Sequence, residues 1–199
     1  MIVDPVKPLV YVLPYAWIFW AVFIYCYGSE SAVMRRSRPT AGEKMDRGSM
    51  TLILLAGAIG TVAAFAVAGI PAFILQHGQR FWFAAGITAL LAGSALRRHC
   101  WRVLGQYFTG NVEVASAQPV IQDGAYRWVR HPSYTGGMLM YLGTGLAMTN
   151  WLSVVIIAVL TFLAYVYRVH VEERALAGQI GAPYEEYMRR TKRFIPFVF

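Results

Sequence analysis

Two clusters of residues that could do chemistry lie at the two ends of one long uncharged stretch. The first is the segment Gly124–Gly136, which contains Arg130 and His131. The uncharged stretch Pro132–Tyr167 follows, and the second cluster, Arg168–Arg174, comes directly after it. Ionisable groups held at membrane depth are functional candidates, because keeping them there is costly. The pattern indicates chemistry at a membrane boundary, on a lipid and with a water-soluble reagent.

The composition is that of an integral membrane protein. Hydrophobic residues make up 57% of the chain and charged residues only 14%, against roughly 25% charged residues in a soluble domain. Uncharged runs long enough to approach the ~20 residues of a membrane-spanning helix predict an all-α fold with about five spans. These are Leu9–Tyr27, Met50–Leu75, Phe81–Leu96 and a hairpin within Pro132–Tyr167 that divides at Thr149–Trp151.

Basic residues give the orientation of these spans. Sixteen of the 18 lysines and arginines fall between spans one and two, between spans three and four, or after span five. The other two, Lys7 and Arg80, fall on the opposite side. Because cytoplasmic loops carry the excess of basic residues, we expect the N-terminus outside and the C-terminus and active site in the cytoplasm. The net charge of +8 is thus a topology signal, and it does not favour nucleic-acid binding.

Residues 1–96 are predicted to form a membrane platform of spans one to three, and residues 97–199 a catalytic region with a two-helix membrane hairpin. Spans two and three are rich in glycine and alanine, which favours close helix packing. Span one lacks a preceding basic segment and is expected to be a retained helix rather than a cleaved signal. Cys26 and Cys100 are isolated, so we expect neither a metal site nor a disulfide framework.

The two clusters each allow a structural interpretation beside the functional one. His131-Pro132 suits a helix start, because proline disfavours helix at the preceding residue and fits the first turn. Arg168 and Glu172 are four residues apart and share a helix face, as they would at any helix end whose long side chains reach for water. A short extended piece is expected at Val112–Ala115 and an amphipathic cytoplasmic helix at Pro183–Thr191.

Taken together in order, these motifs make the chain resemble the isoprenylcysteine carboxyl methyltransferase family, whose wider relatives include phospholipid N-methyltransferases. The resemblance covers about half the chain and leaves the first two spans without a signature. It departs from the family at Ala125, where proline is common, and mildly at Val169. The matching segments are Leu104–Phe108, Gly124–Gly136, Arg168–Leu176, Gly181–Tyr184 with Tyr187, and Thr191–Pro196.

The resemblance implies a membrane methyltransferase that uses S-adenosylmethionine and releases S-adenosylhomocysteine. It implies a cytoplasmic cofactor pocket between the segment before span four and the helix after span five. Arg168 and Glu172 are expected to face the reaction centre and the acceptor. The cofactor pocket is expected to be lined by Gln106, Tyr107, Val120, Tyr126, His131, Pro132, Tyr134 and Glu173.

The chemical group that accepts the methyl distinguishes the possible functions from one another. A carboxylate on an isoprenylcysteine-like lipid acid is already ionised at neutral pH, and Arg168 suits such a group. A phospholipid amine would instead need Glu172 or Glu173 as a base. A non-catalytic membrane scaffold, and a reductase using NADPH, are further alternatives. The acceptor is expected to enter from the bilayer, in the plasma membrane of a prokaryote or the endoplasmic reticulum of a eukaryote.

Overall fold

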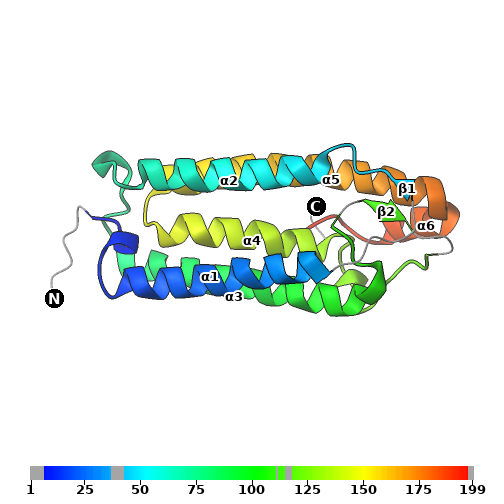
Figure 1. Cartoon of the computed structure of the whole chain (residues 1–199), viewed down its shortest axis with the longest axis horizontal. Coiled ribbons are helices and arrows are strands. Elements are labelled where there is room, and N and C mark those ends of the chain that lie inside the picture. Colours follow the sequence, from blue (N-terminus) through cyan, green and yellow to red (C-terminus); the bar gives the residue numbers. More distant parts are fainter. Residues whose placement is uncertain (1–6, 37–42, 111, 115–117, 197–199) are drawn as a thin grey trace.

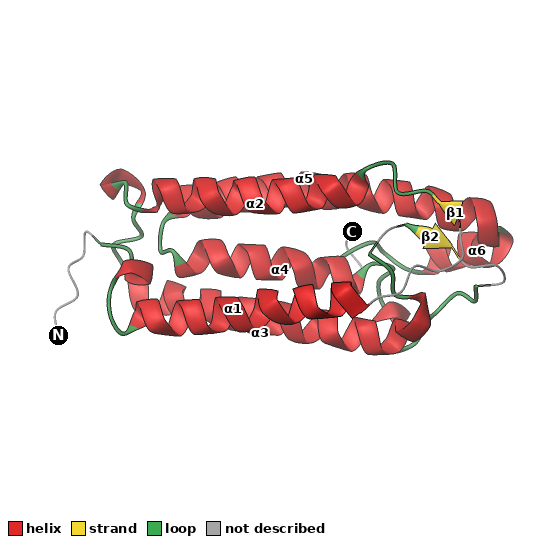
Figure 2. Ribbon diagram, viewed as in Figure 1, coloured by secondary structure: helices red, strands yellow, loops and turns green. Residues whose placement is uncertain are grey.

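The computed structural model describes residues 7–36, 43–110, 112–114 and 118–196. Five long helices run along the long axis of the molecule, and a shorter helix lies with two short strands at one end (Figures 1 and 2). This arrangement confirms the predicted all-α class. The helices are α1 (Tyr15–Arg36), α2 (Ser49–Ala68), α3 (Gln79–Leu104), α4 (Pro132–Ala147), α5 (Trp151–Ile180) and α6 (Ala182–Arg190).

Short elements close the ends of the bundle. Strands β1 (Glu43–Lys44) and β2 (Glu113–Val114) pair antiparallel, with Glu43 opposite Val114. Single 3-10 turns lie at Leu9–Tyr11, Pro71–Phe73, Gly105–Tyr107 and Gly124–Arg127. The β1–β2 pair joins the segment before α2 to the segment before α4. These two regions of the chain meet at the end of the bundle where α1 and α3 end, which is called the polar end below.

The predicted hairpin is found, but several predicted helix bounds are wrong. Asn150 caps α5 by accepting a hydrogen bond from the Ser153 amide at 3.1 Å, which explains the division between α4 and α5. Leu9 lies in a 3-10 turn, and α1 begins only after Pro14. The second helix ends at Ala68 rather than Leu75, because Pro71 follows closely and cannot continue it.

Within the described part of the chain, α2 and α5 are long and apolar enough to cross a membrane by length and composition. For α1, α3 and α4, membrane crossing stays a prediction. The loops nevertheless separate as the basic residues predicted. The connections from α2 to α3 and from α4 to α5 lie at one end of the bundle, and α1 and α3 end, and α2 and α4 begin, at the other (Figure 1).

Helices α3 and α4 pack closely through paired glycines. A Cβ added to Gly86 would lie 2.7 Å from the Gly143 carbonyl oxygen, and one added to Gly93 would lie 2.5 Å from that of Gly136. Both pairs are seven residues apart along their own helix, so they recur on one face. The small residues predicted to allow close packing therefore set the backbone separation beside the first turn of α4.

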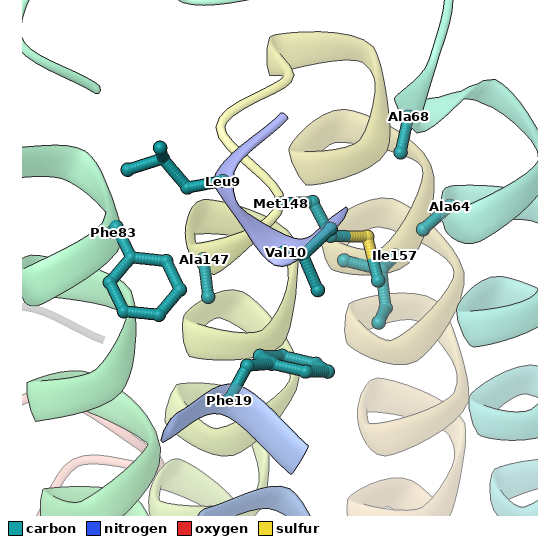
Figure 3. Packing of buried hydrophobic residues seen from close by; sticks show 9 residues of the cluster. All are labelled: Leu9, Val10, Phe19, Ala64, Ala68, Phe83, Ala147, Met148 and Ile157. Atoms are coloured by element: carbon teal, nitrogen blue, oxygen red, sulfur yellow. The ribbon is translucent and has the colours of Figure 1, made fainter. Parts of the chain in front are cut away.

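The hydrophobic core at the other end of the bundle draws on the N-terminal segment and all five long helices (Figure 3). Asn150 fastens α5 to α2 there, by donating to the Ala68 carbonyl oxygen at 3.1 Å. This core joins the helices at one end of the bundle, and a cavity lies between them toward the other end. The core residues are Leu9, Val10, Phe19, Ala64, Ala68, Phe83, Ala147, Met148 and Ile157.

Replacing Gly86 with alanine tests the close α3–α4 contact. The new methyl group would lie 2.4 Å from the Ala147 amide nitrogen, so the helices must separate. We expect Gly86→Ala to cost about 1–3 kcal/mol of unfolding free energy, measured as a lower thermal unfolding midpoint in detergent. Gly28→Ala is the control, because nothing lies within 4 Å of its added Cβ. Equal midpoints for the two variants would contradict this packing.

A candidate active site at the polar end of the bundle

A cavity of about 610 Å³ opens in the half of the bundle that faces the short strands. Its volume lies within the roughly 300–1,000 Å³ of small-molecule sites. One part of its wall is apolar and includes Met50, Ile53 and Leu54 of α2 and Met140 of α4. Another part is polar and aromatic. A ligand in this cavity would therefore meet both kinds of surface at once.

Arg168, Tyr134 and Glu172 form a hydrogen-bonded cluster in the polar wall. The Arg168 Nε donates to the Tyr134 hydroxyl oxygen at 3.0 Å, and that hydroxyl donates to Glu172 Oε2 at 2.5 Å. Arg168 and Glu172 point to the same side because they are one helical turn apart on α5. The cluster places a cation and a carboxylate in contact with one cavity, with a phenol between them.

Three further groups hold the guanidinium of Arg168. Its Nη1 donates to Asp46 Oδ1 and to the Ser49 hydroxyl, the latter at 2.8 Å, and its Nη2 donates to the Gly110 carbonyl oxygen at 2.8 Å. Arg168 is 3% exposed. Four of its five N–H groups thus have partners within the protein, which fixes the orientation of the side chain.

Asp46 is the anionic partner of Arg168 and stands just before α2. Burial alone would raise the pKa of this carboxyl group. Hydrogen bonds from the Met50 amide and the charge of Arg168 outweigh burial, so the pKa of Asp46 is lowered from its usual value. Its carboxylate is therefore charged at neutral pH and compensates Arg168.

Glu173, the neighbour of Glu172, faces a different group of cations. Its carboxylate accepts from Arg130 Nε at 2.9 Å and Arg193 Nη2 at 2.8 Å, and lies 3.3 Å from His131 Nε2. The side chain is 8% exposed. Because all these partners belong to the protein, Glu173 joins α5 to the segments that precede α4 and follow α6.

The C-terminal segment is tied along the start of α4. The amide of Arg130 donates to the Lys192 carbonyl oxygen at 2.8 Å, and that of His131 donates to the Arg193 carbonyl oxygen at 3.0 Å. The Tyr187 hydroxyl of α6 donates to the Tyr126 carbonyl oxygen at 2.6 Å. Burial raises the pKa of the Tyr187 phenol, so it stays a donor. The polar wall of the cavity is thereby braced from behind.

His131 lies between the two carboxylates of α5. Its Nδ1 is 3.8 Å from Glu172 Oε2 and its ring stacks on that of Tyr134, with 5.5 Å between centroids. Non-helical dihedrals at His131, just before Pro132, let its amide reach the C-terminal segment while its ring faces the cavity. The predicted helix start at His131-Pro132 thus positions the His131 side chain in the site.

The structure brings most of the predicted site residues together. Three predicted residues do not line the cavity: Gln106 is exposed, Pro132 is buried as the first residue of α4, and Glu173 is directed at its cations. Direct cofactor contact by these three stays a prediction. Those that line the cavity are Tyr107, Val120, Tyr126, His131, Tyr134, Arg168 and Glu172.

Sequence reasoning missed several residues of the cavity wall or its support. Asp46 and Ser49 hold Arg168, and Glu30 and Arg97 form a partly buried ion pair in the wall. Glu30 and Arg97 each follow the end of a predicted span, the position at which a functional charge is expected. The predicted platform therefore contributes to the site as well as to packing.

In the ranges that the structure describes, no group of three or more histidine, cysteine or acidic side chains could hold a metal ion. Cys26 and Cys100 are both buried and unpaired with each other.

Comparison with known proteins gives one consistent family. Residues 85–178 match the model of the isoprenylcysteine carboxyl methyltransferase (ICMT) family. Protein-S-isoprenylcysteine O-methyltransferase B of Arabidopsis thaliana is 29% identical over 123 residues, which cover 60% of this chain and 62% of that protein. A probable protein-S-isoprenylcysteine O-methyltransferase of Oryza sativa subsp. indica is 26% identical and aligns over 92% of this chain and 96% of its own.

A solved structure also resembles this fold. The eukaryotic intramembrane Ras methyltransferase ICMT matches with a TM-score of 0.61 and 26% identity, over 73% of this chain and 52% of that chain. This chain thus spans less than two thirds of the Arabidopsis relative and of the solved chain. The fold and cavity define an integral membrane protein with an enzyme-like site.

The comparisons agree with the resemblance that the motifs predicted, since the family model, the relatives and the solved structure all carry the name of the isoprenylcysteine carboxyl methyltransferase family. The names of these proteins support the predicted enzyme class, a membrane methyltransferase. The relatives reported above carry O-methyltransferase names, so they give no support to the phospholipid N-methyltransferase or scaffold alternatives.

Replacing Glu173 with glutamine tests its bracing role. Losing one partner of a buried ion cluster leaves Arg130 and Arg193 without their compensating charge. We therefore expect the free energy of unfolding to fall by about 3–5 kcal/mol, measured as a lower thermal unfolding midpoint. The control is Glu186→Gln, which breaks exposed pairs with Arg189 and Arg190 on α6 and should change little. A Glu173→Gln protein as stable as this control would show that the cluster does not hold the segments together.

Proposed function

We propose that this protein is an integral membrane enzyme that transfers a methyl group from S-adenosylmethionine to the carboxylate of an isoprenylcysteine-like lipid acid. The observation that carries the proposal is the cavity itself. It joins the cluster of Arg168, Tyr134 and Glu172 to an apolar wall formed by α2 and α4. An amphipathic acid has the same two parts, an ionised head and an apolar chain.

The donor set of the cavity suits S-adenosylmethionine. This molecule has a sulfonium, which would supply an electrophilic methyl group, and Glu172 and the faces of Tyr126 and Tyr134 can offset such a charge. Burial raises the pKa of the Tyr126 phenol, so it remains neutral. His131 can hydrogen-bond a cofactor carboxylate or ribose. Tyr107 and Val120 complete the lining.

The predicted cofactor residues outside the lining act indirectly in this account. Glu173 holds His131 and Arg130, and Pro132 sets the backbone at His131. Gln106 lies in the turn that ends α3, beside Tyr107. We assign these three residues to positioning the pocket rather than to touching the cofactor.

The acceptor carboxylate needs no base, because it is ionised at neutral pH. Its charge is attracted by Arg168 and repelled by Glu172, so it belongs on the arginine side and the sulfonium on the glutamate side. Arg168 keeps one N–H free of partners in its described surroundings. A bidentate contact with the acceptor therefore requires that one of the four present partners release its N–H group. Alignment of donor and acceptor, with water excluded, is then the main catalytic task.

Arg168→Lys tests the acceptor role. Lysine keeps the charge but cannot reproduce the four hydrogen bonds of the guanidinium. We expect kcat for methyl transfer to fall at least tenfold while S-adenosylmethionine affinity, measured by calorimetry, stays within about twofold. Arg189→Lys, on the exposed face of α6, should change neither quantity. Equal losses of turnover and of cofactor binding would place Arg168 in the cofactor pocket instead.

We propose that the polar end of the bundle faces the cytoplasm, where S-adenosylmethionine is available, in the plasma membrane of a prokaryote or the endoplasmic reticulum of a eukaryote. The support is the segregation of basic loops at that end. Labelling a single cysteine placed at Arg189 with a membrane-impermeant reagent checks this orientation. We expect no labelling in intact cells and full labelling after permeabilisation. Labelling in intact cells would show that this end faces the outside.

A further inference from the structure

Asp46 already supplies the negative charge that the proposed reaction asks the acceptor to bring to Arg168. Its Oδ1 accepts a hydrogen bond from Nη1 of that guanidinium. The Arg168 side chain is 4% exposed and the Asp46 side chain 18%. Because the attraction between two charges grows as water is excluded, Asp46 competes with any other anion that approaches Arg168.

The other partners of the Arg168 side chain carry no charge. The Tyr134 hydroxyl accepts from its Nε at 3.0 Å, the Ser49 hydroxyl from its Nη1 at 2.8 Å, and the Gly110 carbonyl oxygen from its Nη2 at 2.8 Å. These three groups orient the guanidinium without neutralising it. With Asp46 in place, an acceptor carboxylate would be a second anion on one positive charge, and two carboxylates at one site repel each other. Binding of an anionic acceptor therefore favours the departure of Asp46 over that of a neutral partner.

The surroundings of Asp46 allow it to give way. It lies in the connection between β1 and α2, outside any helix. Its Oδ2 accepts from the Met50 amide at 3.2 Å, in the first turn of α2, where free N–H groups favour negative charge. Its Oδ1 also accepts from the Ser49 hydroxyl at 3.0 Å. A carboxylate that turned away from Arg168 would thus still have donors.

Methyl transfer would reverse this exchange. An oxygen of the acceptor carboxylate forms a bond to the methyl carbon, the bond from that carbon to sulfur breaks, and its electron pair stays on the sulfur. No proton moves. The methyl ester that results has no charge, so it cannot compensate Arg168, and Asp46 can return. Compensation at every stage matters because a buried cation without a partner is costly.

We propose that Asp46 is a positioning residue that competes with the acceptor carboxylate for Arg168, gives way when an anionic acceptor binds, and pairs with Arg168 again once the acceptor is a neutral ester. This inference rests on the proposed function and adds to it a control on when Arg168 is available. It also gives the segment before α2, which carries none of the matching motifs, a part in the reaction.

The test measures ligand binding by Asp46→Asn protein in nanodiscs, by calorimetry. N-acetyl-S-farnesylcysteine is the anionic ligand, and its methyl ester is the neutral one. We expect the acid to bind about tenfold more tightly to the variant than to the wild type, because asparagine leaves Arg168 without an anion. The affinity for the ester should stay nearly the same. With S-adenosylmethionine present, KM for the acid should fall by the same factor while kcat does not rise.

Asp123→Asn is the matched control. It neutralises an exposed carboxylate that precedes the turn at Gly124–Arg127 and does not line the cavity. Neither ligand should bind it differently from the wild type. Unchanged or weaker binding of the acid by Asp46→Asn, or an equal gain for acid and ester, would overturn the inference.

Ser49→Ala is the second variant, and it decides the question if Asp46→Asn does not fold. It removes a neutral partner of Arg168 and leaves both charges in place, so the acid should bind about threefold more tightly. Weaker binding would show that the cluster is structural. If the wild type binds the acid but does not methylate it, the proposed function fails and the binding comparison still decides the role of Asp46. If the wild type does not bind the acid, both fail.

Discussion

The buried carboxylate of Glu173 is the constraint on which the site depends. It draws together Arg130 and His131, which precede α4, and Arg193, which follows α6. A carboxylate taken out of water must be matched by nearby cations and donors, so two segments that are distant in sequence are held against α5. With them come the ring of His131 and the backbone before Tyr134. Glu172, the preceding residue on the helix, is thereby left to face the cavity.

If α4 crosses the bilayer as predicted, its short length places this polar cluster at the membrane boundary. Its 16 residues extend about 24 Å at 1.5 Å per residue, less than the ~30 Å hydrocarbon core. Paired glycines hold α4 against α3, so Arg97 and the start of α4 lie side by side. The core at the far end closes the bundle there. A lipid acid can thus meet charged groups without leaving the apolar wall of α2.

Much of this arrangement could be predicted, and the limits have physical causes. The hairpin at Asn150, the breaker at His131 and the shared face of Arg168 and Glu172 follow from local rules of helix capping and spacing, and the structure contains them. Asp46 and Glu30 were missed because their roles arise from contacts with residues far away in sequence. Sequence also cannot tell which of two adjacent carboxylates turns toward a cavity and which toward cations, as Glu172 and Glu173 do here.

The most direct test of the account is methyl transfer by the purified protein in nanodiscs, with labelled S-adenosylmethionine and two acceptors offered side by side. One is N-acetyl-S-farnesylcysteine and the other is phosphatidylethanolamine. The account predicts label on the cysteine acid that is released by base, as a methyl ester requires, and none on the phospholipid. Base-stable label on phosphatidylethanolamine, with the acid unlabelled, would contradict it.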